Sequence, residues 1–257
     1  MKLKAMTFNI RFDNPDDGEH QWQFRQNILA DLIKNFSPAL LGTQEGRQPQ
    51  LKQLAQLLPD LELSEGHREW ISERMYPCIF FDPKRINIER SGDIWLSETP
   101  EIAGSKSFNS SFPRLCTWVQ AKDLEAKKSF VFVVVHLDHM LPETRLAQIK
   151  VLHSEIKKIN TENLPVLLTG DFNEAPDCGV RAFLNQNWPE LCDPWLDQFI
   201  EEQTSFHKFG KAPEDPARID WFLHDSQISC SKIEIDQHSE AGIYPSDHYP
   251  VKVVLKL

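Results

Sequence analysis

Short apolar runs recur along this chain, and the segments between them change in character from one part to the next. Near the N-terminus the runs alternate with amphipathic helical patterns, over residues 22–36 and 50–58. In the middle of the chain, pairs of runs follow one another as in hairpins. Strict alternation would favour a doubly wound parallel sheet, whereas this mixture predicts mixed or antiparallel sheets covered by helices.

The expected elements fill one domain over residues 1–257, with no repeat and no linker in the sequence. A third helix is expected over residues 143–159. The expected strands are residues 2–9, 39–42 (leading to Glu45), 78–81, 86–88, 94–96, 115–121, 129–137, 166–168, 219–223 and 251–257. The longest loops are expected over residues 14–21 and 208–218, and loops of this length often form the walls of sites.

Charge and hydropathy exclude several classes of protein. The chain has 28 Lys and Arg against 38 Asp and Glu, which gives a net charge of −10. This balance argues against avid binding to duplex nucleic acid, which needs clustered cations. No apolar run approaches the roughly 20 residues of a membrane span, and the sequence MKLKAMTFNIRF lacks the apolar core of a signal peptide. We therefore expect no membrane partner, and nothing in the sequence points to an obligate protein partner.

The cysteines predict a reducing environment. Their number is five, they are widely spaced, and no CxxC pair is present. This pattern fits reduced thiols in a cytoplasmic protein better than a disulfide framework or a zinc ribbon.

Polar residues that can bind a cation or a phosphate recur where the expected strands begin or end. These residues are Asn9, Glu45, His136, Asp138, Asp171, Asn173, Asp220, Asp247 and His248. Strand ends at one edge of a sheet can converge on one cleft. Asp220 lies among large apolar residues, so its carboxylate needs a buried partner, and His248, His136 or Arg218 would each serve.

Six segments resemble the motifs of the endonuclease/exonuclease/phosphatase superfamily, in that family's order. They are Thr7-Phe8-Asn9, Gln44-Glu45, His136-Leu137-Asp138, Gly170-Asp171-Phe172-Asn173, Arg218-Ile219-Asp220 and Ser246-Asp247-His248. The phrases NPDDG…W…R, WLSETPE and PRLCTW resemble a bacterial-type branch with no settled substrate. The resemblance implies a four-layer α/β/β/α sandwich, in which two packed mixed sheets are flanked by helices. It also implies metal-dependent hydrolysis of a phosphodiester or phosphomonoester by in-line attack of water.

The resemblance also implies a metal site, and the residue types suit it. Glu45 and Asp247 offer hard oxygen ligands, which suit Mg²⁺ or Mn²⁺. Asn9 is placed with these metal residues, and its amide could also donate to a phosphate oxygen. Asp171 is expected to orient or deprotonate the attacking water.

The remaining catalytic positions are expected to stabilise the phosphoryl group. The amide of Asn173 and the imidazoles of His136 and His248 can donate to its oxygens. Asp220 is expected to hold His248 in one tautomer and to favour its protonated form. An oxygen of Asp220 should then lie about 2.6–3.2 Å from a ring nitrogen of His248.

Five further residues are candidates for substrate binding: Arg114, Asp138, His139, Trp22 and Arg25. Arg114 would clamp a phosphate. The loop over residues 14–21, with Trp22 and Arg25 behind it, is expected to form part of the substrate wall.

Three alternatives remain open at this point. A zinc hydrolase with an HxHxDH motif would need a histidine where the chain has Val134, which leaves too few nitrogen ligands. A catalytically inactive binding module on the same fold would be expected to have lost part of the motif set, which is complete here. A nuclease that cuts single-stranded nucleic acid would use the same chemistry on a short nucleic acid instead of a small phosphoester.

Overall fold

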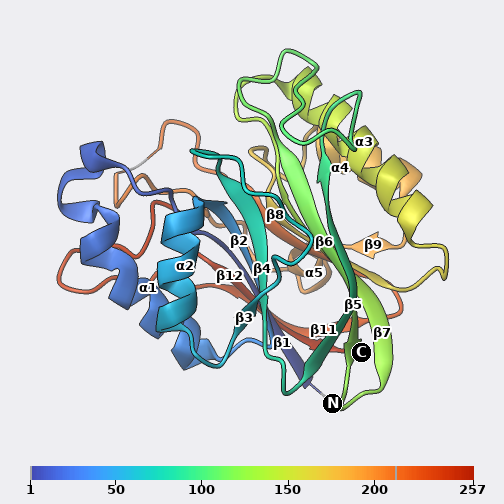
Figure 1. Cartoon of the computed structure of the whole chain (residues 1–257), viewed down its shortest axis with the longest axis horizontal. Helices are drawn as coiled ribbons and strands as arrows, with labels where there is room; N and C mark the ends of the chain where they lie inside the picture. Colours follow the sequence, from blue (N-terminus) through green and yellow to red (C-terminus); the bar gives the residue numbers. More distant parts are fainter. Residues whose placement is uncertain (1, 212) are drawn as a thin grey trace.

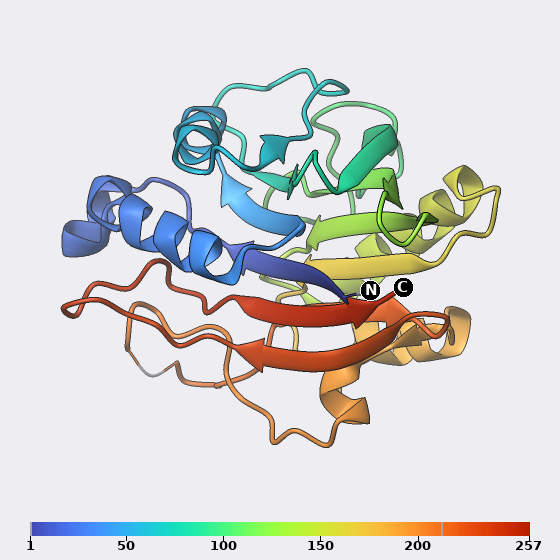
Figure 2. The same cartoon turned by 90° about the horizontal axis from the view of Figure 1, so that it is seen from below.

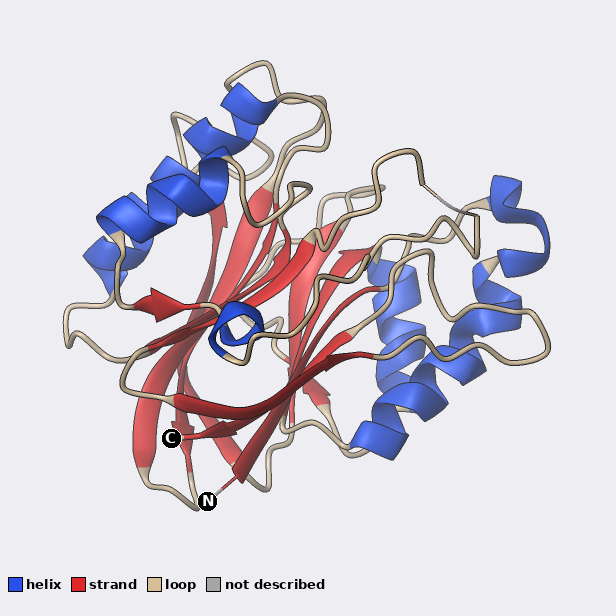
Figure 3. Ribbon diagram, turned by 180° about the vertical axis from the view of Figure 1, so that it is seen from behind, coloured by secondary structure: helices blue, strands red, loops and turns tan. Residues whose placement is uncertain are grey.

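Two six-stranded sheets pack face to face in the computed structural model, which describes residues 2–211 and 213–257. Helices cover the outer face of each sheet, α1 and α2 on one side and α3 and α4 on the other (Figures 1 and 3). The four-layer sandwich implied by the sequence is therefore confirmed. Ala212, within the loop expected over residues 208–218, lies outside the described residues.

The first sheet, sheet A, combines the two ends of the chain with the segments around α2. Its strand order is β11-β12-β1-β2-β4-β3. The strands are β1 (Lys2–Asn9), β2 (Leu40–Gly46), β3 (Glu62–Leu63), β4 (Tyr76–Phe81), β11 (Ser229–Ile235) and β12 (Val251–Lys256). Strand β12 runs antiparallel beside β1, so that the start of β1 and the end of β12 lie side by side (Figure 2).

The second sheet, sheet B, is built from the middle of the chain, in the order β5-β6-β7-β8-β10-β9. Its strands are β5 (Ile86–Trp95), β6 (Leu115–Asp123), β7 (Lys128–His136), β8 (Val166–Asp171), β9 (Leu191–Cys192) and β10 (Asp220–Asp225). The antiparallel pair β6–β7 is the hairpin expected from the sequence.

Six helical segments connect and cover the strands. They are η1 (Pro15–His20), α1 (Trp22–Phe36), α2 (Gln48–Leu57), α3 (Pro142–Ile159), α4 (Gly179–Asn187) and α5 (Pro194–Asp197). The three helices expected from apolar spacing are α1, α2 and α3, and their bounds differ from the expected ones by two residues at most. None of the helices in the described part of the chain is long and apolar enough to cross a membrane.

Strand β7 shows how the layers are filled, because it is apolar on both faces. Phe130, Phe132 and Val134 point between the sheets, where they pack with residues of sheet A. The alternate residues of this strand, such as Val133, pack against α3 through Ile149. A strand with the period-two pattern of side chains but two buried faces reads as a continuous apolar run. This explains the sequence FVFVVV in β7.

Gly170 permits the close pairing of β7 with β8 just before Asp171. Its φ is +141°, and a Cβ atom at this position would lie only 2.0 Å from the carbonyl oxygen of Val135. Glycine is the residue that tolerates such an approach. The glycine of the Gly-Asp-Phe-Asn segment therefore sets the path of the chain that delivers Asp171.

Several parts of the secondary structure differ from the sequence expectation, among them β5, α4, β11 and the short elements η1, β3, β9 and α5. Residues 86–88 and 94–96 were expected to be separate strands, but β5 runs through Ser91 and Gly92 with a bulge between Ile88 and Arg90. Each residue on both sides of that bulge pairs with β6, so the glycine interrupts the apolar pattern without interrupting the ladder. Helix α4 and strand β11 were not expected at all.

Candidate active site

Cross-strand register brings three of the expected site residues into one row. His136 ends β7 and pairs with Asp171 at the end of the parallel strand β8. Asp171 in turn pairs with Asp220, which begins the antiparallel strand β10. An antiparallel neighbour starts where a parallel one stops, so the beginning of β10 lies at the same edge as the ends of β7 and β8.

Sheet A contributes a second row at the same end of the molecule. Asn9 ends β1 beside Gln44, and Glu45 is the next residue of β2. The loop carrying Asp247 and His248 precedes β12, whose first residue, Val251, pairs with β1. The hydroxyl of Ser246 donates to the carbonyl oxygen of Asn9 at 2.6 Å, which fastens this loop to the end of β1.

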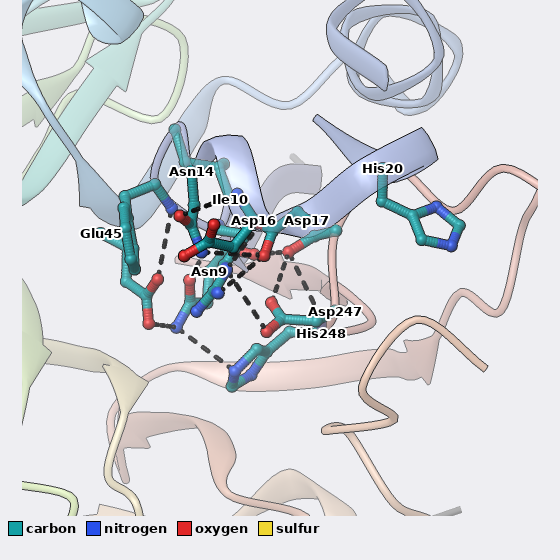
Figure 4. Close-up of polar contacts among 12 residues, drawn as sticks. Asn9, Ile10, Asn14, Asp16, Asp17, His20, Glu45, Asp247 and His248 are labelled. Carbon is teal, nitrogen blue, oxygen red and sulfur yellow. Dashed lines mark hydrogen bonds and ion pairs between the residues drawn. The ribbon is translucent and has the colours of Figure 1, made fainter. Parts of the chain in front are cut away.

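Asn9 lies at the centre, between residues of both rows. Its amide nitrogen donates to Glu45 Oε1 at 3.1 Å and to Asp171 Oδ2 at 2.9 Å. The same nitrogen lies 3.4 Å from Nε2 of His248, and Figure 4 shows Asn9 between Glu45 and His248. Its amide oxygen accepts from the backbone N–H of Arg11 at 3.0 Å. Asn9 therefore lies between the carboxylates of Glu45 and Asp171 and donates a hydrogen bond to each.

Glu45 is held in an uncommon backbone conformation. Its φ is +67°, at a point where the register of β2 against β4 is irregular. A non-glycine residue in this region costs free energy, and such strain is concentrated at functional sites. The carboxylate is fixed from two sides, by Asn9 and by the backbone N–H of Phe12, 3.3 Å from Oε2.

Asp220 and His248 form a buried pair across the two rows. Nδ1 of His248 lies 2.8 Å from Oδ2 of Asp220, within the distance expected from the sequence. Of the three partners considered for Asp220, the structure selects His248. Arg218 instead pairs with Asp193 at 3.0 Å and with Glu202 at 2.8 Å.

Burial and neighbouring charges shift the pKa values of the central groups. Burial, and then the charge of Asp220, raises the pKa of Asp171 to about 7. Burial alone would lower the pKa of His248, but the charge and hydrogen bond of Asp220 raise it to about 10. Burial and Arg114 hold the pKa of His136 well below its usual value. His248 is therefore cationic at neutral pH, whereas His136 is neutral.

Arg114 and two histidines form the wall contributed by sheet B. One guanidinium nitrogen of Arg114 lies 3.1 Å from both ring nitrogens of His136, and the other lies 3.3 Å from Nδ1 of His139. Arg114 is buried and forms no ion pair with a carboxylate among the described residues, and its Nε has no hydrogen-bond partner there. A buried cation without a counter-charge is costly, so this wall is suited to an anion.

Asn173 lines the cleft, whereas Asp138 does not. Asn173, with φ +51°, lines the cleft while its side-chain amide donates to the carbonyl oxygen of Leu137 at 3.0 Å. Asp138 is buried and accepts from the side chains of Ser110 and Ser111 at 3.0 and 2.7 Å. Asp138 therefore joins two loops behind the cleft, and we no longer place it among the substrate contacts.

Arg25 and Trp22, expected to contact substrate, do not line the cleft. Arg25 is fully buried, and its guanidinium donates to backbone carbonyl oxygens, among them those of Ile10 at 2.6 Å and Pro245 at 2.9 Å. The indole N–H of Trp22 donates to the side chain of Gln53 at 2.7 Å. Both are buried residues of α1.

A cleft of about 590 Å³ is lined by Glu45, Asp171, Asp247 and His248, together with Arg114 and His136 of the sheet B wall. Residues 14–21 were expected to form a wall, but in the described part of the chain none of them lines this cleft. Arg11 and Phe12, just before this segment, line it instead. Asp17 supports that wall indirectly, by pairing with Arg11 at 2.9 Å. Further residues that the sequence did not predict also line the cleft: Arg11, Phe12, Arg47, Glu73, Arg74, Met75, Phe112, Pro113, Phe206 and Ile219.

The residues at the base of the cleft fit a hard divalent cation. Oxygens of Glu45 and Asp171 lie within 4.8 Å of each other, and a ring nitrogen of the cationic His248 lies within the same distance of both. Asp247 lines the same cleft, and burial raises the pKa of its carboxyl group. Buried carboxylates with raised pKa values are stabilised by a cation, and an oxygen-rich set suits Mg²⁺ or Mn²⁺ better than Zn²⁺.

The profile of the endonuclease/exonuclease/phosphatase family matches residues 6–248. The chain belongs to this family. The family's enzymes hydrolyse phosphate esters and generally depend on a divalent metal ion. The match spans all six motifs that carried the resemblance in the sequence.

Solved structures of bacterial members of this family are similar over the whole chain. An endonuclease/exonuclease/phosphatase from Bacteroides vulgatus is 27% identical, with a TM-score of 0.91 over 100% of this chain and 99% of that one. A mannosyl-6-phosphatase from Bacteroides thetaiotaomicron is 26% identical, with a TM-score of 0.87 over 99% and 100%. The Drosophila melanogaster protein angel is 27% identical over 173 residues, 63% of this chain, and the chain spans about half of its length.

Proposed function

We propose that this protein is a Mg²⁺- or Mn²⁺-dependent hydrolase of a small phosphoester. The carrying observation is the Asp220–His248 pair beside Asn9, Glu45 and Asp171, all at one end of the two sheets. Likeness to a mannosyl-6-phosphatase over nearly the whole chain makes sugar phosphomonoesters the first substrates to test. The same likeness favours a small phosphoester over single-stranded nucleic acid.

The metal in this proposal would be held by Glu45 and Asp247. A bound divalent cation would polarise the phosphoryl group and offset charge that develops in the transition state. Asn9 and the backbone N–H of Phe12 keep the carboxylate of Glu45 in place for this task.

The protein's own groups would orient water and neutralise the phosphoryl oxygens. Asp171, whose Oδ2 lies 2.9 Å from the amide nitrogen of Asn9, accepts a proton from the attacking water. His248, kept cationic by Asp220, donates from Nε2 to a phosphoryl oxygen. Arg114 and His136 donate to the other oxygens from the opposite wall, and Asn173 lies at the edge of the same cleft.

A substrate panel tests this proposal. The purified protein is assayed with Mg²⁺ or Mn²⁺ on p-nitrophenyl phosphate, bis(p-nitrophenyl) phosphate, mannose 6-phosphate, glucose 6-phosphate and a single-stranded oligonucleotide. We expect hydrolysis of a small ester that disappears in EDTA. Cleavage of the oligonucleotide alone would favour the nuclease, and turnover that survives exhaustive chelation would contradict the metal dependence.

A further inference from the structure

Arginines gather at the cleft although the chain as a whole is acidic. Four of the eleven arginines line it, namely Arg11, Arg47, Arg74 and Arg114, while none of the seventeen lysines does so in the described part of the chain. The net charge of the whole chain is −10. The planar guanidinium group suits bidentate binding of phosphate, so this distribution indicates a role in binding anions rather than in general solubility.

These arginines lie on two sides of the cleft. Arg114 directly precedes β6 and belongs to the wall of sheet B with His136 and His139. Arg47 directly follows β2, and Arg74 lies two residues before β4. The last pair in the ladder of β2 and β4 joins Gly46 with Tyr76, so Arg47 and Arg74 continue from neighbouring strand ends of sheet A.

The pair on sheet A has unused binding capacity. Arg47 Nη1 lies 3.3 Å from Glu73, whose side chain is 78% exposed, and such a pair contributes little. Nε of Arg47 is buried and has no hydrogen-bond partner among the described residues. The guanidinium lies 4.8 Å from the ring centre of Phe12, in a cation–π contact. Arg74 has no side-chain hydrogen bond or ion pair with another described residue, whereas Arg11 is occupied by Asp17.

The size of the cleft leaves room for a ligand larger than one phosphate. Its volume of about 590 Å³ is within the range of sites that hold whole small molecules. The carboxylates of Glu45, Asp171 and Asp247 lie at the metal side, so a second anion would be repelled there. The guanidinium groups on sheet A are the favourable place for it.

We propose that Arg47 and Arg74 form a second anion-binding subsite, which selects phosphoesters that carry another phosphate group besides the one cleaved. This inference rests on the proposed function, because that function places the scissile ester at the metal side. A sugar bisphosphate is the simplest compound of this class. The sugar would bridge the two walls, with one phosphate at Arg114 and the other at Arg47 and Arg74.

A matched pair of substrates tests the subsite. We compare glucose 1,6-bisphosphate with glucose 6-phosphate by kcat/KM, measured as phosphate release in Mg²⁺. The wild type should prefer the bisphosphate about tenfold or more, as expected for an added charge-assisted phosphate contact. The R47Q/R74Q variant should lose about tenfold on the bisphosphate and threefold at most on the monophosphate. The control R90Q removes an arginine on β5, where Arg90 contacts Ile159 and Trp118, and should change neither value.

Binding measured without turnover separates this inference from the proposed function. Isothermal titration calorimetry with both sugars, in Mg²⁺, is done with D171N added to every protein, so that no ester is cleaved. It should show tighter binding of the bisphosphate by D171N and by D171N/R90Q, and no such preference in D171N/R47Q/R74Q. If the preference in binding is present while the wild type hydrolyses no ester, the subsite stands and the proposed function fails. If esters are hydrolysed but the wild type has no preference, or the double variant weakens both sugars equally, the subsite is overturned.

Discussion

Nδ1 of His248 donates a 2.8 Å hydrogen bond to Oδ2 of Asp220, and this bond joins the two sheets of the sandwich. Asp220 begins β10 in sheet B, whereas His248 precedes β12 in sheet A. Both side chains are buried. The pair therefore depends on the packing of the sheets against each other, and it aims Nε2 of His248 toward Asn9 and Asp171.

Replacing Asp220 with Asn tests whether the carboxylate orients and charges the imidazole. Asparagine keeps the shape, but it lowers the pKa of His248 and can stabilise the wrong tautomer. We expect kcat to fall by roughly 10²–10⁴-fold, by analogy with carboxylate–histidine pairs in other hydrolases. Steady-state kinetics and the free energy of unfolding are measured together.

The control for this change is D225N at the other end of the same strand. Asp225 accepts a hydrogen bond from the backbone N–H of Gln227 and lies far from the cleft, so stability alone should change. Adding H248A to D220N should cost little more than H248A alone, because the two residues act as a unit. Losses that multiply would show that they act independently.

Glu45→Gln should raise the Mg²⁺ concentration needed for half-maximal activity and also lower kcat. The amide keeps the size of the side chain but removes the negative charge that attracts the cation. Activity is measured over a range of Mg²⁺ concentrations and compared with E62Q, which changes an exposed glutamate on β3. An unchanged Mg²⁺ requirement in E45Q would remove Glu45 from the metal site.

A buried ion pair outside the site should make stability depend on acid pH. Asp93 accepts from Arg68 Nε at 2.7 Å and from the hydroxyl of Thr117 at 2.7 Å. Burial alone would raise the pKa of Asp93, but Arg68 and His67 lower it to about 2. This stabilisation is complete above the unfolded pKa near 4 and is lost as the pH falls through 2.

The difference between wild type and D93N should follow that titration. In urea unfolding at pH 7 the carboxylate contributes about 2 kcal/mol through its shifted pKa, and by pH 3 about half of this is gone. The gap in free energy of unfolding between the two proteins should therefore narrow by about 1 kcal/mol. A gap that stays constant from pH 7 to pH 3 would show that the charge of Asp93 does not stabilise the fold.

Elements with two buried faces or a clear apolar stripe were predictable from the sequence, and weakly patterned ones were not. Strand β7 and helix α1 carry patterns that packing against neighbouring layers requires. Strand β11 lies at the edge of sheet A, and one of its seven residues is buried, so little selects an apolar pattern there. Helix α4 spans only nine residues and begins at Gly179, and its N-cap residue, Cys178, makes no side-chain cap.

The residues of the candidate site also fall into those that the sequence could reveal and those that it could not. Residues that end or begin strands, such as Glu45 and Asp171, could be found because their polarity interrupts apolar runs. Arg74 and Phe112 lie in loops without a pattern, and only the tertiary structure brings them to the cleft. Arg25 was misplaced because a charged residue beside a candidate loop suggests a substrate contact, whereas here its charge is satisfied by backbone carbonyl groups.

Arg25 should control the geometry of the metal site from a distance. Besides Ile10 and Pro245, its guanidinium donates to the carbonyl oxygens of Arg11 at 2.7 Å and His20 at 2.9 Å. It thereby ties the segment after Asn9 to the loop before Asp247. Burial lowers the pKa of Arg25 to about 10, so the group stays cationic at neutral pH.

Arg25→Met removes these donors and leaves buried carbonyl groups without partners, so the free energy of unfolding should fall by about 2–4 kcal/mol. A purely structural role predicts no more than this. A positioning role also predicts, well below the melting temperature, a higher Mg²⁺ requirement and a lower kcat, with partial recovery in R25K, which keeps the charge. The matched control is R181M, which removes another buried helical arginine, on α4, and should lower stability without changing the Mg²⁺ requirement. Equal Mg²⁺ dependence in R25M and R181M would show that Arg25 serves stability alone.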